Sequence, residues 1–283
     1  MYKLFSVLQL VRFHNCLLAG AGVWVGGYLT ILPDREISLY LASLAVALVC
    51  GAGNAFNDYR DIESDRINHP GRPLPSGKLL PSEALLTAGV LAVFSIIISA
   101  LVGPVLLSVI IALILLLFLY SLKIKKMPFW GNLTVAVAGA TSFVVGGIPA
   151  GKAALTMFPG VWIPALFALI FHFGREMVKD VADLEGDMKE NIRSLPAILS
   201  TCAALGIMTF VIFVLIILTI VPLLFNWYNQ TYGYIAIFLV DIPLVLIIAF
   251  LWVSKRQNRF GRAATLFKLL MLVGLIAFVA GKS

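Results

Sequence analysis

Two clusters of acidic residues stand out because the rest of the chain contains few carboxylates. In each cluster three aspartates follow one another at positions i, i+3 and i+7, a spacing that places side chains on one face of a helix. The first cluster also contains Asn57, which precedes Asp61 by four residues and Asp65 by eight and so shares their face. We therefore expect two helical segments that each present a row of carboxylates, from Asp58, Asp61 and Asp65, and from Asp180, Asp183 and Asp187.

Carboxylates on one helix face repel one another, and near a membrane their charge is costly, so a bound cation is the simplest reason to place them together. Oxygen ligands without a nearby cluster of cysteines or histidines favour a hard ion such as Mg2+, which binds through carboxylates and substrate phosphates. The sequence thus predicts a diphosphate held by Mg2+ at a membrane surface. The expected metal ligands are Asn57, Asp58, Asp61, Asp65, Asp180, Asp183 and Asp187.

Among these ligands, we expect Asp61, Asp65, Asp183 and Asp187 to be the catalytic residues. The alternative for any acidic residue here is a solvated loop charge or a cap on a helix end. That alternative weighs more for Asp58, Glu63, Glu185 and Glu190.

The composition indicates a membrane protein built entirely from helices. Hydrophobic residues make up 61% of the chain, charged residues make up 12%, and the mean hydropathy is +1.01. A soluble domain has a charged fraction of roughly 25%. Because a transmembrane helix needs about 20 apolar residues, we expect nine spans, over residues 13–32, 39–56, 85–102, 105–120, 132–149, 162–181, 203–225, 234–253 and 264–280.

The positions of lysine and arginine predict how these spans are oriented. If the N-terminus is cytoplasmic, all but three of the 21 basic residues lie on the cytoplasmic side, the exceptions being Arg35, Lys152 and Lys282. The positive-inside rule predicts this asymmetry for a multi-pass protein of the cell membrane. Both acidic clusters then face the cytoplasm. The net charge of +7 is explained by loops that face anionic lipid, so we expect no nucleic-acid partner.

A basic loop over residues 66–81 follows the first acidic cluster. Three prolines before Ser76 stiffen it, and Arg72 and Lys78 can contact an anion. The alternative for both cations is a loop charge that only sets the topology. The other candidates for contacts to substrate oxygens are Lys123, Lys125, Arg175 and Lys179, with Tyr120 at the mouth of the site.

These residues make the chain resemble the UbiA superfamily of intramembrane prenyltransferases. The resemblance is carried by Asn57-Asp58-x-x-Asp61-x-x-x-Asp65, by Asn68-x-x-x-Arg72-Pro73-Leu74-Pro75-Ser76-Gly77 and by Asp183-x-x-x-Asp187. Within the superfamily, residues 50–58 and 175–187 and the pair Arg12-x-x-Asn15 are similar to the branch that contains digeranylgeranylglyceryl phosphate synthase. The resemblance implies a single domain over residues 1–283, an active site on the cytoplasmic side, and substrate-binding roles for Asn54 and Asn68.

By that resemblance, the donor is geranylgeranyl diphosphate, the cofactor is Mg2+, and the acceptor is the glycerol hydroxyl of geranylgeranylglyceryl phosphate, an ether-lipid precursor. An aromatic acceptor, such as a hydroxybenzoate or a quinone precursor, is the alternative within the superfamily. Arg175 and Lys179 lie one helical turn apart beside the second acidic cluster, which slightly favours an acceptor that carries a phosphate. A transporter or channel is the alternative from another class, but transport gives no role to the Arg-Pro-Leu-Pro segment.

Asp241 lies alone inside the eighth predicted span. An ionisable residue in the membrane is a functional candidate, but its place in the outer half favours a buried partner for a polar group. His14, His69 and His172 are isolated in the sequence, and we expect them to have core or interface roles.

Overall fold

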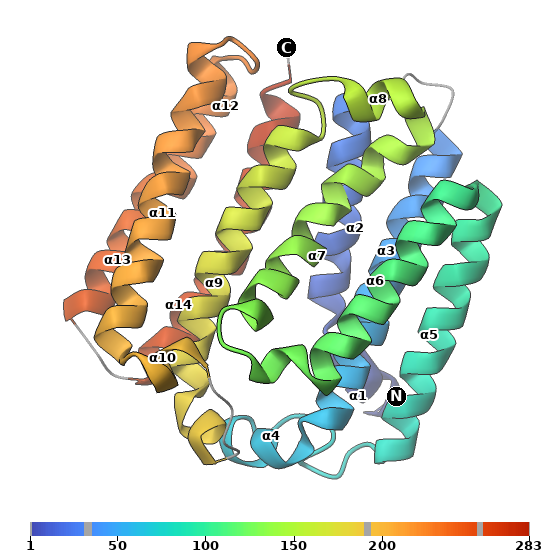
Figure 1. Ribbon diagram of the computed structural model, residues 1–283, viewed down its shortest axis with the longest axis vertical. Coiled ribbons are helices and arrows are strands. Elements are labelled where there is room, and N and C mark those ends of the chain that lie inside the picture. The colour runs from blue at the N-terminus through green and yellow to red at the C-terminus, as the bar shows by residue number, and fades with distance from the viewer. Residues whose placement is uncertain (1, 31–35, 190–193, 254–256, 283) are drawn as a thin grey trace.

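The computed structural model describes residues 2–30, 36–189, 194–253 and 257–282, and over these residues its elements are helices. The all-helical fold predicted from the sequence is confirmed. The long helices run side by side along the long axis of the molecule (Figure 1). In chain order the elements are α1 (Tyr2–Leu10), α2 (Phe13–Thr30), α3 (Glu36–Arg60), α4 (Ile62–Asn68), α5 (Pro81–Val102), α6 (Pro104–Leu122), η2 (Ile124–Lys126), α7 (Trp130–Gly147), η3 (Ile148–Ala150), α8 (Lys152–Thr156), α9 (Trp162–Lys189), α10 (Leu195–Ile198), α11 (Thr201–Leu224), α12 (Gln230–Tyr234), the π-helical η4 (Ile235–Asp241), α13 (Ile242–Val253) and α14 (Gln257–Ala280).

Seven helices of the described chain are long and apolar enough to cross a membrane: α3, α5, α6, α7 with η3, α11, the run from α12 to α13, and α14. The bent pair of α1 and α2 passes the same test together, with an angle of 52° between its parts. Although α9 has 28 residues, it is not among the seven, since charged residues begin at Arg175. The nine predicted segments each fall on one of these helices, and most ends agree to within a few residues, but α9 continues eight residues beyond its predicted end and α14 begins seven residues before its predicted start. Leu32, the predicted end of the first, lies outside the described residues, and the count of nine spans stays a prediction.

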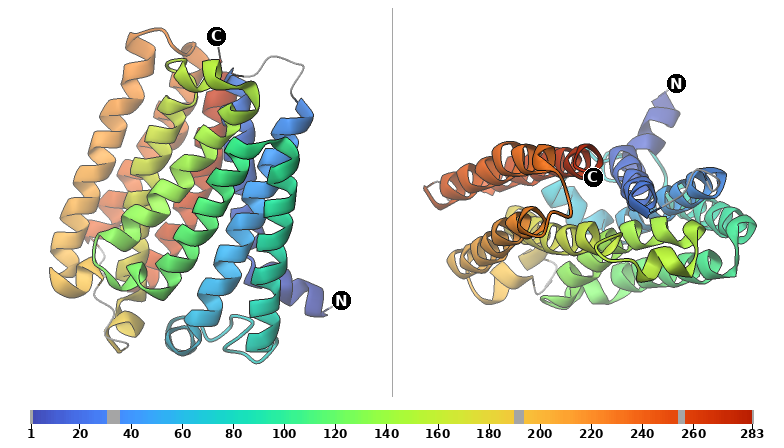
Figure 2. Two further views of the ribbon diagram at one scale, coloured as in Figure 1. Left: turned by 45° about the vertical axis from the view of Figure 1, so that its right-hand side comes forward. Right: turned by 90° about the horizontal axis from the view of Figure 1, so that it is seen from above.

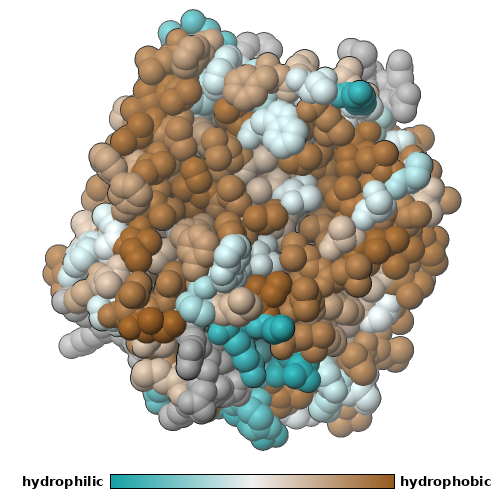
Figure 3. All heavy atoms as spheres, viewed as in Figure 1, coloured by the Kyte–Doolittle hydropathy of each residue, from teal (hydrophilic) through white to brown (hydrophobic). Residues whose placement is uncertain are grey.

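The two ends of the molecule differ in polarity. We call one the α4 end, because α4 lies there together with α1 and α10, whereas α8, α12 and the C-terminus lie at the other end (Figures 1 and 2). The flanks expose large apolar side chains such as Leu86, Phe210 and Leu246. In Figure 3 these flanks are mostly hydrophobic, and hydrophilic side chains gather at the α4 end. Apolar flanks of this extent suit lipid as the surrounding solvent.

Small residues bring α2 and α7 close together. A methyl group added to Gly26 of α2, or to Gly146 of α7, would overlap a backbone carbonyl of the opposite helix. Close backbone packing of this kind holds membrane helices together because lipid supplies no hydrophobic force between them. Just before α2, Arg12 adopts a left-handed backbone conformation with φ of 51°, and the chain bends there between α1 and α2.

The first acidic cluster does not lie on one continuous helix, so the expectation from its spacing is wrong in this respect. α3 ends at Arg60, Asp61 occupies a turn, and α4 follows directly. The backbone N–H of Asp61 still donates to the Asn57 carbonyl at 2.9 Å, and that of Asp65 donates to the Asp61 carbonyl at 2.8 Å. The break lets α4 run across the end of the bundle toward α9 (Figure 1). The second cluster lies on the unbroken α9, as expected.

Candidate functional site

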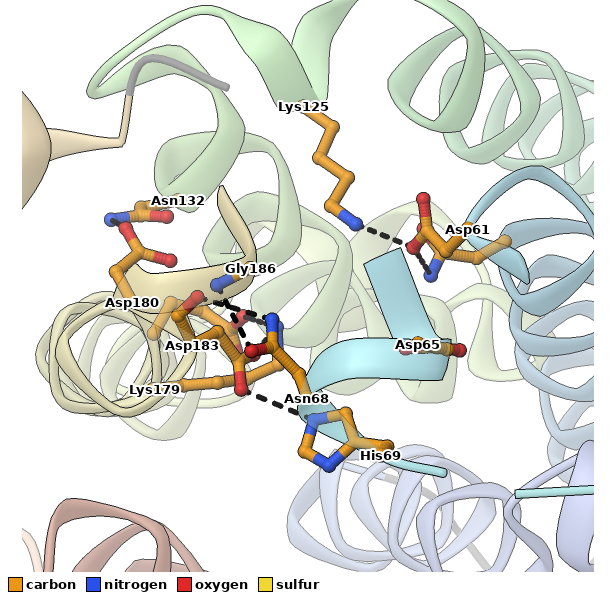
Figure 4. A network of polar contacts seen from close by, with 12 residues as sticks. Asp61, Asp65, Asn68, His69, Lys125, Asn132, Lys179, Asp180, Asp183 and Gly186 are labelled. Carbon is orange, nitrogen blue, oxygen red and sulfur yellow. Dashed lines mark hydrogen bonds and ion pairs between the residues drawn. The ribbon is translucent and has the colours of Figure 1, made fainter. Parts of the chain in front are cut away.

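The two acidic clusters come together at the α4 end, where α4 packs on α9. A small polar pocket of about 40 Å³ lies between them. Figure 4 shows side chains from α4, from α9 and from the connection between α6 and α7 around this region. The polar residues that line the pocket are Arg12, Asn57, Asp61, Ser64, Asp65, Asn68, His69, Arg72, Tyr120, Lys125, Asn132, Lys179, Asp180, Asp183, Asp187 and Ser194. Most of the predicted site residues are therefore gathered in one place.

In the first cluster, a basic side chain holds each carboxylate that lines the pocket. Asp61 accepts hydrogen bonds from Lys125 Nζ at 2.5 Å and from Asn57 Nδ2 at 2.6 Å. Asp65 accepts two from Arg72, at 2.5 and 2.6 Å. Burial raises the pKa of Asp65 above its usual value, although Arg72 acts in the opposite direction. The negative charge on Asp65 is thus costly, and further positive charge nearby would stabilise it.

The second cluster is partly neutralised in the same way. Asp183 Oδ1 lies 3.1 Å from His69 Nε2, and Asp183 Oδ2 lies 3.5 Å from Lys179 Nζ. Burial opposes the charged form of Asp183, but Lys179 and His69 outweigh it and hold its pKa below the usual range. At the other end of the cluster, burial raises the pKa of Asp187 to about 6, against the pull of Lys179 and Lys125. The two carboxylates therefore differ in how easily they carry a charge.

Amide side chains join the elements that carry the two clusters. Asn68 Nδ2 donates to the Asp183 carbonyl at 3.1 Å, and the Gly186 N–H donates to Asn68 Oδ1 at 3.1 Å. These two bonds attach the end of α4 to one turn of α9 (Figure 4). On the other side of α9, Asn132 of α7 donates to Asp180 Oδ2 at 2.8 Å. The spacing between the clusters is thus fixed by hydrogen bonds as well as by packing.

Asp58, Lys78 and Lys123 are predicted site residues that do not line the pocket. Asp58 is only 2% exposed, and it accepts a hydrogen bond from Arg12 Nη2 at 2.6 Å and lies 3.6 Å from Arg72 Nη1. These contacts suit a residue that positions the two arginines. Lys78 and Lys123 have exposed side chains and do not line the pocket.

The donor set of the pocket fits a hard divalent cation. Carboxylate and amide oxygens from both clusters line it, and the raised pKa values of Asp65 and Asp187 show that burial disfavours their charges unless a cation is near. Within the described ranges, no three side chains of His, Cys, Asp or Glu converge closely enough to hold a metal ion. The carboxylates are held instead by Lys125, Arg72 and Lys179.

A larger cavity of about 440 Å³ extends from this pocket into the bundle. Arg12, Tyr120, Lys179 and Asp183 line both spaces, so the two are adjacent. The body of the cavity is apolar, with aromatic walls that include Phe143, Phe167 and Phe171. A cavity with one charged end and an apolar body can hold an amphipathic molecule whose anionic group lies in the pocket.

Asn54 and Arg175, two further predicted site residues, line this larger cavity and not the pocket. Asn54 Nδ2 donates to the Val11 carbonyl at 3.0 Å. Arg175 forms an ion pair with the neighbouring Glu176. Arg175 and Lys179, which we expected to act together, therefore face partly different spaces.

Asp241 lies at the opposite end of the cavity from the acidic clusters. Its side chain is 5% exposed, and Thr219 Oγ1 lies 2.7 Å from its Oδ2. Tyr232 also lines this end and donates through its hydroxyl to the Thr219 carbonyl at 3.3 Å. The expectation of a buried polar partner for Asp241 is confirmed.

Sequence reasoning missed His69, which was assigned to a core or interface role although it contacts Asp183. The partners are 114 residues apart in the chain, and only the adjacency of His69 to Asn68 could have pointed to it. Asn132 and Ser194 also line the pocket without having been singled out. Of the acidic residues weighed from the sequence, Glu190 lies outside the described residues.

The comparisons with known proteins agree on one family. The UbiA prenyltransferase family matches residues 16–279. The digeranylgeranylglyceryl phosphate synthase of Methanococcus aeolicus is 33% identical over 281 residues, which cover 99% of this chain and 98% of that protein. The enzyme of the same name from Methanocaldococcus jannaschii is 34% identical over 284 residues, covering 99% of this chain and 97% of that one.

Solved structures extend this similarity to three dimensions. A structure of digeranylgeranylglyceryl phosphate synthase matches with a TM-score of 0.73 and 32% identity, over 99% of both chains. The apo structure of a UbiA homologue from Aeropyrum pernix matches with a TM-score of 0.80 at 18% identity, over 95% of this chain and 98% of that chain. A UbiA homologue from Archaeoglobus fulgidus, bound to GPP and Mg2+, matches with a TM-score of 0.70 at 19% identity, over 96% and 99% of the two chains. The last two show the fold alone.

Proposed function

We propose that this chain, which belongs to the UbiA prenyltransferase family, transfers a geranylgeranyl group from geranylgeranyl diphosphate to the glycerol hydroxyl of geranylgeranylglyceryl phosphate. The observation that carries the proposal is the meeting of two acidic clusters around one pocket at the charged end of an apolar cavity. Two relatives that carry the name of this activity, at 33% and 34% identity over nearly the whole chain, support the choice of substrates.

The diphosphate of the donor would lie in the pocket with Mg2+ as the cofactor. The proposed metal ligands that line the pocket are Asn57, Asp61, Asp65, Asp180, Asp183 and Asp187. When bound, the metal would neutralise charge on the diphosphate as it leaves. The binding of GPP and Mg2+ by the Archaeoglobus fulgidus homologue supports this choice.

The chain's own cations would complete the electrostatic stabilisation. Arg72, Lys125 and Lys179 line the pocket and now contact its carboxylates. They can also donate hydrogen bonds to diphosphate oxygens, where they would stabilise the charge that develops as the carbon–oxygen bond breaks. No strong nucleophile is required of the protein, because the allylic group becomes electrophilic once its leaving group is neutralised.

The larger cavity would hold the prenyl chain and exclude water. Its aromatic walls, which include Phe143 and Phe171, provide an apolar surface for the chain, and ring faces near the charged end attract a carbocation. Exclusion of water matters because water would otherwise compete with the acceptor hydroxyl for the reactive carbon. Asp58 would position Arg12 and Arg72 rather than bind the metal directly.

We further propose that the chain forms a single domain of nine spans in the cell membrane, with the α4 end and the N-terminus in the cytoplasm. The basic residues of the loops at that end support this orientation. The donor would then reach the pocket from the cytoplasm, and the prenyl chains would lie at the depth of the lipid tails.

The direct test is to incubate the purified protein with geranylgeranyl diphosphate, Mg2+ and single acceptors, and to identify each product by mass. The acceptors are geranylgeranylglyceryl phosphate, its dephosphorylated counterpart and a hydroxybenzoate. We expect the doubly prenylated glycerophosphate to form fastest. Faster prenylation of the hydroxybenzoate would replace the proposed acceptor with an aromatic one and leave the family assignment in place.

A further inference from the structure

The larger cavity contains a lysine that the donor site does not use. Lys268, on α14, lines the cavity, and its Nζ lies 2.8 Å from His14 Nε2 at the start of α2. A charged Lys268 can only donate in this contact, and His14 then accepts through Nε2 as a neutral ring. In that state the contact leaves the charge of Lys268 uncompensated. No carboxylate of the described chain forms an ion pair with it.

Two arginines add to the positive charge around Lys268. Arg12, Arg175 and Glu176 line the same cavity as Lys268. Arg175 forms an ion pair with Glu176, whose other oxygen lies 3.8 Å from Lys179 Nζ, so that one carboxylate is shared by two cations. Arg175 Nε is buried and has no hydrogen-bond partner. Buried donors and uncompensated charges are costly, and an anion in the cavity would satisfy both.

This group of cations overlaps only in part with the one at the donor pocket. Lys125 lines the pocket only, whereas Arg175 and Lys268 line the larger cavity only. Arg12, Arg72 and Lys179 line both spaces. Such an arrangement suits two anions held side by side, with shared cations between them.

We propose that Arg12, Arg175 and Lys268 form a second anion site, which binds the phosphomonoester of a prenylated glycerophosphate while its chain lies in the apolar part of the cavity. The inference rests on the proposed function for the identity of this lipid. It differs from the expectation from the sequence, which paired Arg175 with Lys179. Phosphate oxygens would accept charge-assisted hydrogen bonds from the ammonium of Lys268 and from Arg175.

The surroundings of Lys268 support a lipid as the source of the phosphate. Thr265 and Gly261, which precede Lys268 on α14 by three and seven residues, line the cavity and are exposed. A mouth of the cavity beside Lys268 would account for this exposure. A lipid that enters there would bring its phosphate to the lysine before its chain fills the apolar interior.

A binding experiment tests the site independently of catalysis. Wild-type protein in detergent, without divalent cation, is titrated with geranylgeranylglyceryl phosphate, with its dephosphorylated counterpart and with free glycerol phosphate. We expect the phosphorylated lipid to bind at least about tenfold more tightly than the other two. Lys268→Met should lose this preference, and Lys268→Arg should recover most of it, which separates loss of charge from misfolding. The matched control Lys152→Met removes an exposed lysine that does not line the cavity and should behave as wild type.

The kinetic readout separates this inference from the proposed function. In the prenyl-transfer assay, Lys268→Met should raise the KM for the glycerophosphate lipid about tenfold and change the KM for the donor by less than about twofold. A rise in the donor KM alone, equal binding of the phosphorylated and dephosphorylated lipids by the wild type, or tighter binding of free glycerol phosphate would overturn the site as a lipid-phosphate site. Preferential binding of the phosphorylated lipid without product formation would support the site and overturn the proposed acceptor.

Discussion

The Asn68 side chain brackets the backbone of α9 at Gly186: its Nδ2 donates to the Asp183 carbonyl and its Oδ1 accepts from the Gly186 N–H, both at 3.1 Å. A side chain at residue 186 would occupy the same space, because a methyl group there would overlap the Asn68 amide. A Cβ at this position would therefore displace the Asn68 amide and break both hydrogen bonds.

Gly186→Ala should lower kcat/KM more than tenfold, because displacing the Asn68 amide breaks the two side-chain hydrogen bonds that attach α4 to α9 beside the carboxylates. The measurement is prenyl-transfer kinetics, with thermal unfolding in detergent to show that the protein remains folded. Gly206→Ala is the matched control, since a methyl group there meets no atom within 4 Å. Equal activity of the Gly186→Ala and Gly206→Ala variants would mean that the two hydrogen bonds between Asn68 and the α9 backbone are not needed for activity.

His69 should act through Asp183 rather than on the substrate directly. His69→Leu removes the contact to Asp183 Oδ1 at 3.1 Å, so we expect kcat/KM to fall about tenfold and the Mg2+ concentration for half-maximal activity to rise. His69→Gln keeps a donor at a similar reach and should recover much of the loss. If leucine raises only the KM for the donor and leaves the Mg2+ dependence unchanged, His69 contacts the diphosphate instead.

Asp241 should be dispensable for the chemistry, because it lies at the far end of the cavity from the acidic clusters. Asp241→Asn keeps an oxygen near Thr219 Oγ1, and we expect activity within about threefold of wild type. Asp241→Leu leaves Thr219 without this partner and should lower the free energy of unfolding by about 1–3 kcal/mol. This loss would be seen as a lower midpoint temperature of thermal unfolding. A loss of turnover in the asparagine variant as deep as that of a cluster aspartate would bring Asp241 into the mechanism.

In the proposed topology the N-terminal ends of α5 and α10 lie at the cytoplasmic face of the membrane. The N-terminal end of α12 lies at the opposite face. In a background without native cysteines, cysteines at the exposed residues Ser82 and Ala197 should react with an impermeant reagent from the cytoplasm. A cysteine at the exposed Gln230 should react from the opposite side. Labelling of the cysteines at positions 82 and 197 from different sides of the membrane would rule out the proposed nine-span topology.

Much of the fold follows from sequence because membrane helices depend on hydropathy, which is a local property. The predicted segments coincide with the helices, and α9 was found despite its charges, since its apolar first half is long enough to begin a span. The break at Asp61 was not predicted. The backbone bonds of Asp61 and Asp65 keep helical spacing through the break, so the sequence pattern is the same with or without it.

The site could be predicted in its residue types but not in its pairings. The spacing of the aspartates indicated the two faces, since helical periodicity alone decides which side chains share a face. The partners of Asp58 and Asp183, which are Arg12 and His69, depend on how distant helices pack. For the same reason Lys268, which meets His14 across 254 residues of chain, carried no signal in the sequence.

The central claim is that both acidic clusters build one cation-dependent site for the donor diphosphate. The most direct measurement is the affinity of geranylgeranyl diphosphate for the protein, without acceptor, by calorimetry with and without Mg2+. Wild type should bind with Mg2+ and lose about a hundredfold or more in affinity in EDTA, and Asp61→Ala and Asp183→Ala should each bind as weakly as wild type in EDTA. Glu63→Gln, which changes an exposed carboxylate of the first cluster paired with Arg66, should bind as wild type does. Full affinity in EDTA, or loss of binding from a change in one cluster only, would contradict the shared site.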